Sequence, residues 1–151
     1  MRILDAEATS GLLHGLVHLD TQRAAVGLDL TVDRVARLVS PGALDFGGSE
    51  FEAAGRETLE PEPASPGDDY GWWELEAGTY LVGYNEAPDL HGGRVGLVQA
   101  LPRLQRAGAS HPAFVVDGAE NPVETLLRVG EAGCRLKENC RISRLLVFET
   151  R

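Results

Sequence analysis

Short runs of β-branched, aromatic and aliphatic residues, separated by glycine, proline and acidic clusters, constrain the fold of this chain more than any other feature. Such runs are typical of strands joined by turns. One run, residues 25–33, has an apolar residue at every second position: Val26, Leu28, Leu30 and Val32. This alternation predicts a strand buried on one face. We predict further strands over residues 72–75, 79–84, 94–100, 114–116, 123–129 and 141–148. Many short strands and 18 glycines together predict an all-β domain of the sandwich or barrel type.

Helical patterns are confined to two short segments. Residues 5–14 are expected to form a short helix that is weakened near Ser10 and stopped at Gly15. Residues 102–107 begin with proline, which is favoured in the first turn of a helix, and Gly108 follows as a stop signal. The chain is therefore expected to contain one or two short helices.

The middle of the chain favours turns and loops. Residues 40–71 are rich in glycine and proline, and within them residues 60–69 are acidic and proline-rich. We expect this last stretch to be an exposed excursion rather than a linker, because neither flank has the composition to fold alone. Residues 1–151 are therefore interpreted as a single domain.

The charge balance limits the possible partners. With 14 basic and 23 acidic residues the net charge is −9, and no basic stripe offsets it. Such a surface repels a phosphate polymer, so no nucleic acid partner is expected, whereas two or three arginines suffice to bind a small anion. No stretch approaches the roughly 20 apolar residues that cross a membrane, and the N-terminus has no apolar signal core. We expect a cytoplasmic protein without membrane contact.

Metal-ligand spacing is not found in the sequence. Cys134 and Cys140 are six residues apart with no cluster of histidine or cysteine around them, which favours reduced thiols. The histidines are scattered, and the pair His14 and His18 has no third ligand nearby. We expect no resident metal.

Five segments in order resemble motifs of the trimeric dUTPase/dCTP deaminase superfamily. They are residues 25–30 (AVGLDL), 75–83 (LEAGTYLVG), 89–95 (DLHGGRV), 115–118 (VVDG) and 136–149 (LKENCRISRLLVFE). The second is similar to a strand–turn–strand of dCTP deaminases, and the last is similar to their closing strand. The resemblance implies a dUTPase-like distorted jelly roll with one or two short helices. It also implies a homotrimer that binds a deoxynucleoside triphosphate between subunits.

Two aspartates carry the catalytic part of the resemblance. Asp29 matches the carboxylate of the first motif, which in dUTPases helps to hold the Mg²⁺–triphosphate complex through water. The alternative is an aspartate on the solvent face of a strand. Asp117 matches a residue that touches the sugar and orients the attacking water, as a general base does. The alternative is a turn-initiating aspartate before Gly118.

Three arginines are candidates for phosphate binding. Arg103 and Arg106 lie on the expected helix 102–107, which in the family grips the phosphates. Arg144 stands where the family has a phosphate-contacting glutamine. The alternatives are solvated helix arginines, salt bridges between subunits, and, for Arg144, a plain surface position.

Several departures from the family pattern weigh against catalysis. The helix 102–107 lacks the family's Ser-Ser pair, and the third motif continues as Ala119-Glu120-Asn121-Pro122 in place of an aromatic–glycine pair. The glutamate that deaminases use falls near Leu126 or Leu127, with Glu124 at a different step of the strand. We also expect no glycine-rich C-terminal arm.

Two functional hypotheses follow from this balance. The first is an enzyme of deoxynucleotide metabolism that hydrolyses dUTP, or dCTP, with Mg²⁺. Hydrolysis is favoured over deamination because Asp117 is present whereas the deaminase glutamate is missing. The alternative is a catalytically silent nucleotide-binding or structural trimer of the same fold.

Overall fold

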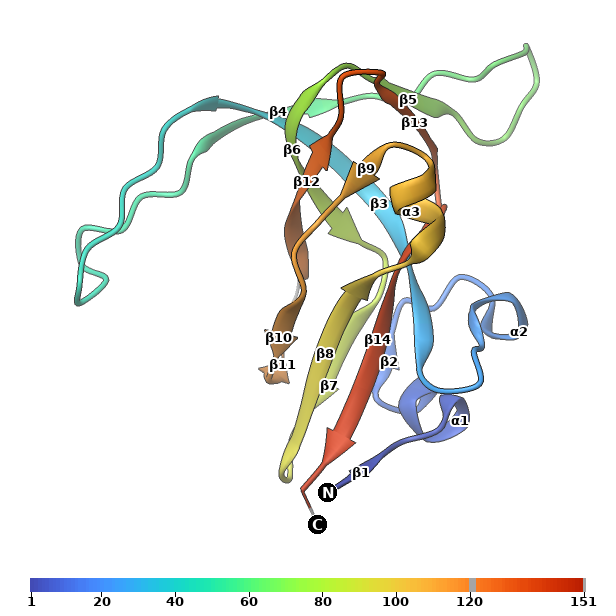
Figure 1. Ribbon diagram of the computed structural model, residues 1–151, viewed down its shortest axis with the longest axis vertical. Helices are drawn as coiled ribbons and strands as arrows, with labels where there is room; N and C mark the ends of the chain where they lie inside the picture. Colours follow the sequence, from blue (N-terminus) through green and yellow to red (C-terminus); the bar gives the residue numbers. More distant parts are fainter. Residues whose placement is uncertain (120–121, 151) are drawn as a thin grey trace.

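The computed structural model describes residues 1–119 and 122–150, which form mainly antiparallel sheets (Figure 1). The main sheet has the strand order β10 (Phe114–Val116), β8 (Arg94–Ala100), β14 (Arg141–Glu149), β3 (Leu28–Ser40), β6 (Gly78–Tyr84), β12 (Glu124–Val129) and β9 (Ala109–Ser110). In addition, β1 (Arg2–Ile3) pairs with β14 and β4 (Gly55–Leu59) pairs with β3. The all-β prediction is confirmed.

Two smaller sheets and short helices complete the described part of the chain. One sheet has the order β11 (Gly118–Ala119), β7 (Ala87–Leu90) and β2 (Leu13–His14), and a ribbon joins β13 (Cys134–Lys137) to β5 (Trp72–Leu75). The helices are α1 (Ala6–Ser10), α2 (Leu19–Gln22) and α3 (Pro102–Arg106). No helix among the described residues has the length and apolar character needed to cross a membrane.

The longest strand, β3, connects the two halves of the main sheet. Its first residues pair with β14, where Asp29 lies opposite Arg144. Its later residues pair with β6 on one side and β4 on the other. The predicted strand 25–33 begins too early, because Gly27 adopts a positive φ of 77° in the turn before β3. It also ends too early, because partners that are remote in sequence extend β3 to Ser40.

The prediction that this strand is buried on one face only is wrong. The first five residues of β3 are all buried, whereas Val26 is exposed. One face contributes apolar side chains to the core, and on the other face the Thr31 side chain bonds to the buried Glu86 and the Asp29 side chain bonds to two arginines of β14. Local alternation of apolar residues does not reveal such a polar covering.

The pairing of strands corrects one further expectation. Residues 40–71 contain β4, a strand whose partner is the second half of β3, although the sequence favoured turns there. Strands β5 and β6 form as predicted: β5 pairs with β13, and β6 pairs with β3 and β12. The acidic stretch 60–69 is mostly exposed, as expected.

The predicted helix ends are partly confirmed. Helix α3 begins at Pro102 and is followed by Gly108, whose φ is 97°, as the sequence indicated. Helix α1 ends at Ser10, the weak point of the segment, instead of continuing to His14. Its N-terminus is capped by the Asp5 side chain, which accepts a hydrogen bond from the backbone N–H of Ala8.

The core lies between the curled parts of the main sheet. Its fully buried side chains include Val32, Val35, Val82, Val98, Val116, Leu127, Leu145 and Val147. Each such side chain stabilises the fold by about 1.5–3 kcal/mol relative to an exposed position. This packing holds β3 and β14 side by side, and the candidate site is built on those two strands.

Candidate functional site

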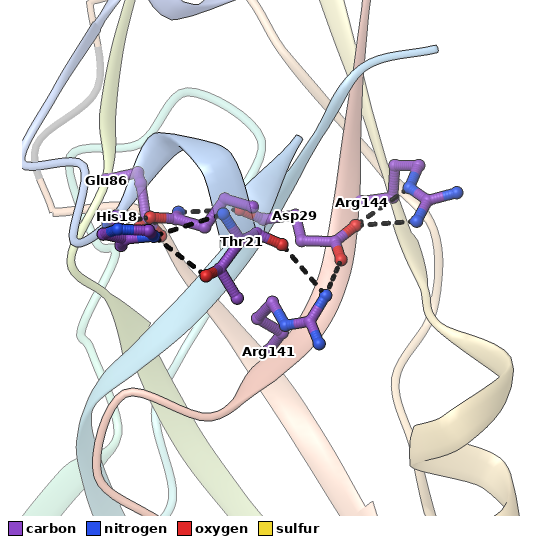
Figure 2. A network of polar contacts seen from close by, with 7 residues as sticks. His18, Thr21, Asp29, Glu86, Arg141 and Arg144 are labelled. Atoms are coloured by element: carbon purple, nitrogen blue, oxygen red, sulfur yellow. Dashed lines mark hydrogen bonds and ion pairs between the residues drawn. The ribbon is translucent and has the colours of Figure 1, made fainter. Parts of the chain in front are cut away.

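Asp29 lies between two guanidinium groups of β14 (Figure 2). Arg141 Nη1 is 3.0 Å from Asp29 Oδ2, and Arg144 Nε and Nη2 are 2.9 and 2.8 Å from Oδ1. The Asp29 side chain is 4% exposed, whereas those of Arg141 and Arg144 are 32% and 38% exposed. The alternative of a solvent-facing Asp29 is therefore wrong, and Arg144 is not a plain surface residue.

A β-bulge explains why both arginines face Asp29. Residues three apart on a regular strand point to opposite faces. In β14, however, Arg141 pairs with Thr31 while Ser143 pairs with the next residue of β3, Leu30. The irregularity adds one residue between Arg141 and Ser143, which returns Arg141 to the face of Arg144.

A second carboxylate, Glu86, lies beside this group and is 1% exposed. Its Oε1 accepts a hydrogen bond from the Thr31 backbone N–H at 2.6 Å, and its Oε2 accepts from Thr31 Oγ1 at 2.6 Å. Gln22 Nε2 donates both to Glu86 Oε2 at 3.1 Å and to the Asp29 carbonyl at 2.9 Å. Burial raises the pKa of Glu86 above its ordinary value, because the charged form loses its hydration.

These bonds connect helix α2 to the arginines. Because Gln22 ends α2 and bonds to β3, the helix is held over the strand. The Thr21 carbonyl in α2 then accepts a hydrogen bond from Arg141 Nη1 at 3.2 Å. Glu86 and Gln22 were not found from the sequence, because their partners in β3 are separated from them along the chain.

The opposite face of β14 carries a buried polar chain. Ser143 Oγ lies 2.6 Å from the Tyr84 hydroxyl and 2.7 Å from His111 Nε2. His111 Nδ1 lies 2.8 Å from the Pro112 carbonyl, which can only accept, so Nδ1 carries the proton and Nε2 accepts from Ser143. Burial lowers the pKa of His111 and raises that of Tyr84, because the charged form of each side chain would lose its hydration.

Arg141 also lines a hollow of about 410 Å³ beside helix α3. Arg103, one of the predicted phosphate-binding residues, lines the same hollow. The charged side chains Arg135 and Lys137 line it too, with their cationic groups 4.5 and 5.4 Å from the ring centre of Trp72. The structure thus brings Arg103 and Arg141 to one basic hollow, although the chain as a whole is acidic.

The remaining predicted residues lie elsewhere. Arg106 is exposed on α3, and Asp117 is exposed after β10. The registers of β10, β8 and β14 place Asp117 level with Phe148, with β8 between them, and Phe148 is four residues along β14 from Arg144. With three strand spacings in between, the path from Asp117 to Asp29 along the sheet is roughly 20 Å. One chain therefore does not bring the two aspartates together.

The position of the deaminase glutamate is filled by apolar residues. Leu127 is buried in the core, and Leu126 is 45% exposed on the outer face of β12. Glu124 shares the face of Leu126 but bonds to Arg56, with Nη1 2.9 Å from Oε1. Within the segment 119–122, which stands in place of the aromatic–glycine pair, Glu120 and Asn121 lie outside the described residues.

The described residues do not fit a resident metal ion. They contain no group of three or more His, Cys, Asp or Glu side chains placed to hold one. His18 Nδ1 accepts a hydrogen bond from the Thr21 backbone N–H as the N-cap of α2. Asp29, the residue that the resemblance connects with Mg²⁺, is already bonded to two cations.

Curated relatives of the chain carry a consistent name. The chain is 33% identical over 144 residues to the probable deoxyuridine 5′-triphosphate nucleotidohydrolase of Methanosarcina acetivorans, covering 94% of this chain and 81% of that protein. The protein of the same name from Methanosarcina mazei gives the same identity and coverage. That of Methanococcoides burtonii is 29% identical over 143 residues, covering 93% of this chain and 81% of that protein. A scan against protein-family models finds no match.

A solved structure has a similar fold. The 2′-deoxycytidine 5′-triphosphate deaminase from Agrobacterium tumefaciens matches with a TM-score of 0.67 at 15% sequence identity. The match covers 96% of this chain and 47% of the deaminase chain, so this chain spans about half its length. The likeness confirms the predicted dUTPase-like distorted jelly roll. Together with the relatives at 33% identity, it shows that the chain belongs to the dUTPase/dCTP deaminase superfamily.

Proposed function

We propose that this chain is an enzyme of deoxynucleotide metabolism that hydrolyses dUTP, or dCTP, to the monophosphate and pyrophosphate. The observation that carries the proposal is the group formed by Asp29, Arg141 and Arg144, which joins the first and last family motifs at one place. Two guanidinium groups and one carboxylate have a net charge of +1, and planar guanidinium groups suit phosphate oxygens. The names of the curated relatives support the same substrate class.

Arg103 and Arg106 extend the proposed phosphate site. Arg103 shares the basic hollow with Arg141, which supports a role for Arg103 in binding the far end of a triphosphate. Arg106 is exposed one turn further along α3 and is proposed to contribute charge rather than a fixed contact. Mg²⁺ would reach the site with the nucleotide, held by its phosphates, and no step of the proposed reaction is routed through the metal.

The proposed active unit is a homotrimer of single-domain chains with shared sites. Asp117 is the proposed general base that takes a proton from the attacking water, and it is exposed and remote from Asp29 of its own chain. A neighbouring copy that supplies Asp117 completes the site. This arrangement predicts that an Asp117→Asn chain and an Arg144→Gln chain, each inactive alone, regain partial activity when they are refolded together.

The test of the function is direct. The purified protein is incubated with dUTP and with dCTP in the presence of Mg²⁺, and the products are separated by ion-exchange chromatography. We expect dUMP from dUTP or dCMP from dCTP. Formation of dUTP from dCTP would instead identify a deaminase, and unchanged nucleotides at high protein concentration would contradict an enzymatic function.

A catalytically silent nucleotide-binding trimer is the second candidate. It is favoured by Leu126 and Leu127, which leave the deaminase position without a carboxylate. Thermal unfolding with and without dUTP distinguishes a silent binder from a purely structural trimer, because only a protein that binds the nucleotide is stabilised by it.

A further inference from the structure

The carboxylate of Asp29 has little capacity left for a metal-bound water. Oδ1 accepts a hydrogen bond from Nε of Arg144 and lies 2.8 Å from Nη2 of the same side chain, and Oδ2 accepts a hydrogen bond from Nη1 of Arg141. A carboxylate oxygen accepts about two hydrogen bonds, so each oxygen retains at most one position, and on Oδ1 the Nη2 group of Arg144 lies against it. With its side chain 4% exposed, Asp29 also has almost no surface at which hydrated Mg²⁺ can approach.

The charges around Asp29 oppose a cation for a second reason. The carboxylate contributes −1 and the two guanidinium groups contribute +2, so that the group is positive overall. A divalent cation at this place would lie next to two cations in a partly buried site, where their repulsion is weakly screened. While the two ion pairs hold, Asp29 does not fit the role of a water-mediated Mg²⁺ ligand.

The same arrangement suits an anion. A guanidinium group has five N–H donors, and the bonds within the described chain do not use Nη2 of Arg141 or Nη1 of Arg144. Both side chains are about one-third exposed, so these edges can reach a ligand. Arg141 is held additionally by the Thr21 carbonyl, and its other side faces the basic hollow that contains Arg103 and Lys137.

We propose that Asp29 is a positioning residue that fixes Arg141 and Arg144 for direct binding of a polyphosphate, and that this binding needs no Mg²⁺. For the nucleotide as ligand the inference rests on the proposed function, whereas for inorganic triphosphate it rests on the geometry alone. The two ion pairs hold the guanidinium planes in place before the ligand arrives, which lowers the entropy lost on binding.

Titration calorimetry with inorganic triphosphate, in EDTA and in excess Mg²⁺, tests the proposal. We expect binding in EDTA that is equal to or tighter than binding in Mg²⁺, because Mg²⁺ neutralises part of the phosphate charge that the arginines recognise. Binding that is found only with Mg²⁺, or no binding in either condition, would overturn the proposal.

The Asp29→Asn variant separates a positioning role from a metal role. If Asp29 positions the arginines, the variant loses about tenfold or more in affinity in EDTA, although its site gains positive charge. If Asp29 acts through Mg²⁺, affinity in EDTA is unchanged or higher, and the loss is seen only with Mg²⁺. The second result contradicts the proposal.

If Asp29→Asn does not fold, the Arg144→Gln variant provides the test instead. Arg144→Gln leaves the ion pair between Asp29 and Arg141 intact. We expect a loss of about tenfold or more in EDTA. Arg37→Gln, on the exposed part of β3, removes the same charge away from the site and is expected to bind triphosphate as the wild type does. Equal affinities of the Arg144 and Arg37 variants would refute the proposal.

Parallel titrations with dUTP and dCTP distinguish the inference from the proposed function. Nucleotide binding that requires Mg²⁺ would refute the inference and leave the function intact. If inorganic triphosphate bound in EDTA but neither nucleotide did, the result would support polyphosphate binding by Arg141 and Arg144. It would also contradict the proposed substrate class.

Discussion

At the scale of single residues, Asp29 and Glu86 are both buried carboxylates at β3, but their surroundings differ. Asp29 has two cationic partners, so its charge is compensated where it lies. Glu86 accepts hydrogen bonds from Thr31 and Gln22 and has no cation among the partners that the structure describes for it. An uncompensated buried charge is unfavourable, which is why burial raises the pKa of Glu86.

This raised pKa predicts a specific pH dependence of stability. A carboxyl group that binds its proton more tightly in the folded state stabilises the fold at pH values below its unfolded pKa of about 4.5. That contribution is lost as the pH rises through the raised pKa. The wild type should therefore lose stability relative to Glu86→Gln as the pH increases from about 4.5 towards neutrality.

Urea unfolding of the wild type and of Glu86→Gln across this pH range measures the difference. Glu60→Gln, in the exposed acidic stretch, is the matched control and should change stability by less than about 0.5 kcal/mol throughout. If the free energies of unfolding of the wild type and of Glu86→Gln differed by the same amount at every pH, Glu86 would have the same pKa in the folded and the unfolded chain, contrary to the prediction.

Asp117 gives a second prediction at this scale. Since Asp117 is exposed, Asp117→Asn should leave the melting temperature almost unchanged. If it is the general base, dUTP hydrolysis should fall by about 100-fold or more. Full activity in the variant would identify Asp117 as a turn residue only.

At the scale of elements, the site depends on how β3 and β14 begin. Gly27 turns the chain into β3 with a φ of 77°, and a Cβ atom built there would collide with the Leu145 carbonyl oxygen of β14. The bulge of β14 then decides which side chains face Asp29. Both features are backbone conformations at strand pairings, and the two arginines depend on them.

Replacing Gly27 by alanine should therefore disturb the pairing of β3 and β14. We expect a loss of about 2 kcal/mol or more in the free energy of unfolding, from the left-handed φ and the contact with Leu145. Gly47→Ala, where no neighbouring atom lies within 4 Å, is the control and should be nearly neutral. Equal unfolding midpoints in urea for the two variants would contradict this reading of Gly27.

At the scale of the whole molecule, an apolar segment projects far from the sheets. We call residues 41–54, between β3 and β4, the arm; Figure 1 shows it extending away from the sheets. Its side chains Leu44 and Phe46 are 89% and 110% exposed, and Phe51 is 57% exposed. Apolar side chains gathered on a projecting segment are typical of a surface that is covered in an assembly.

The proposed trimer gives this arm a partner, since a second copy of the chain would cover it. Light scattering after size exclusion should give three chains per particle at micromolar concentration. The double substitution Leu44→Ser and Phe46→Ser should weaken the assembly without unfolding the chain, because neither side chain belongs to the core. A monomeric wild type would contradict the shared site, and a trimeric double variant would exclude the arm from the interface.

The sequence by itself determined the class of fold, most strand positions, helix α3, and the family. It could do so because strand composition, turn residues and motif order are local properties that are read along the chain. It also pointed to Asp29 and Arg144, which the structure brings into direct contact, whereas their proposed catalytic and phosphate-binding roles stay predictions.

Only the tertiary structure decided what these residues are bonded to. The bulge after Arg141, the burial of Glu86 against Thr31, and the pairing of β4 with the end of β3 all join segments that are distant in sequence. Whether a carboxylate faces water, a metal or two arginines depends on such partners, because burial and charge pairing set its free energy. Asp29 was therefore identified from its motif, but its two guanidinium partners became visible only in the fold.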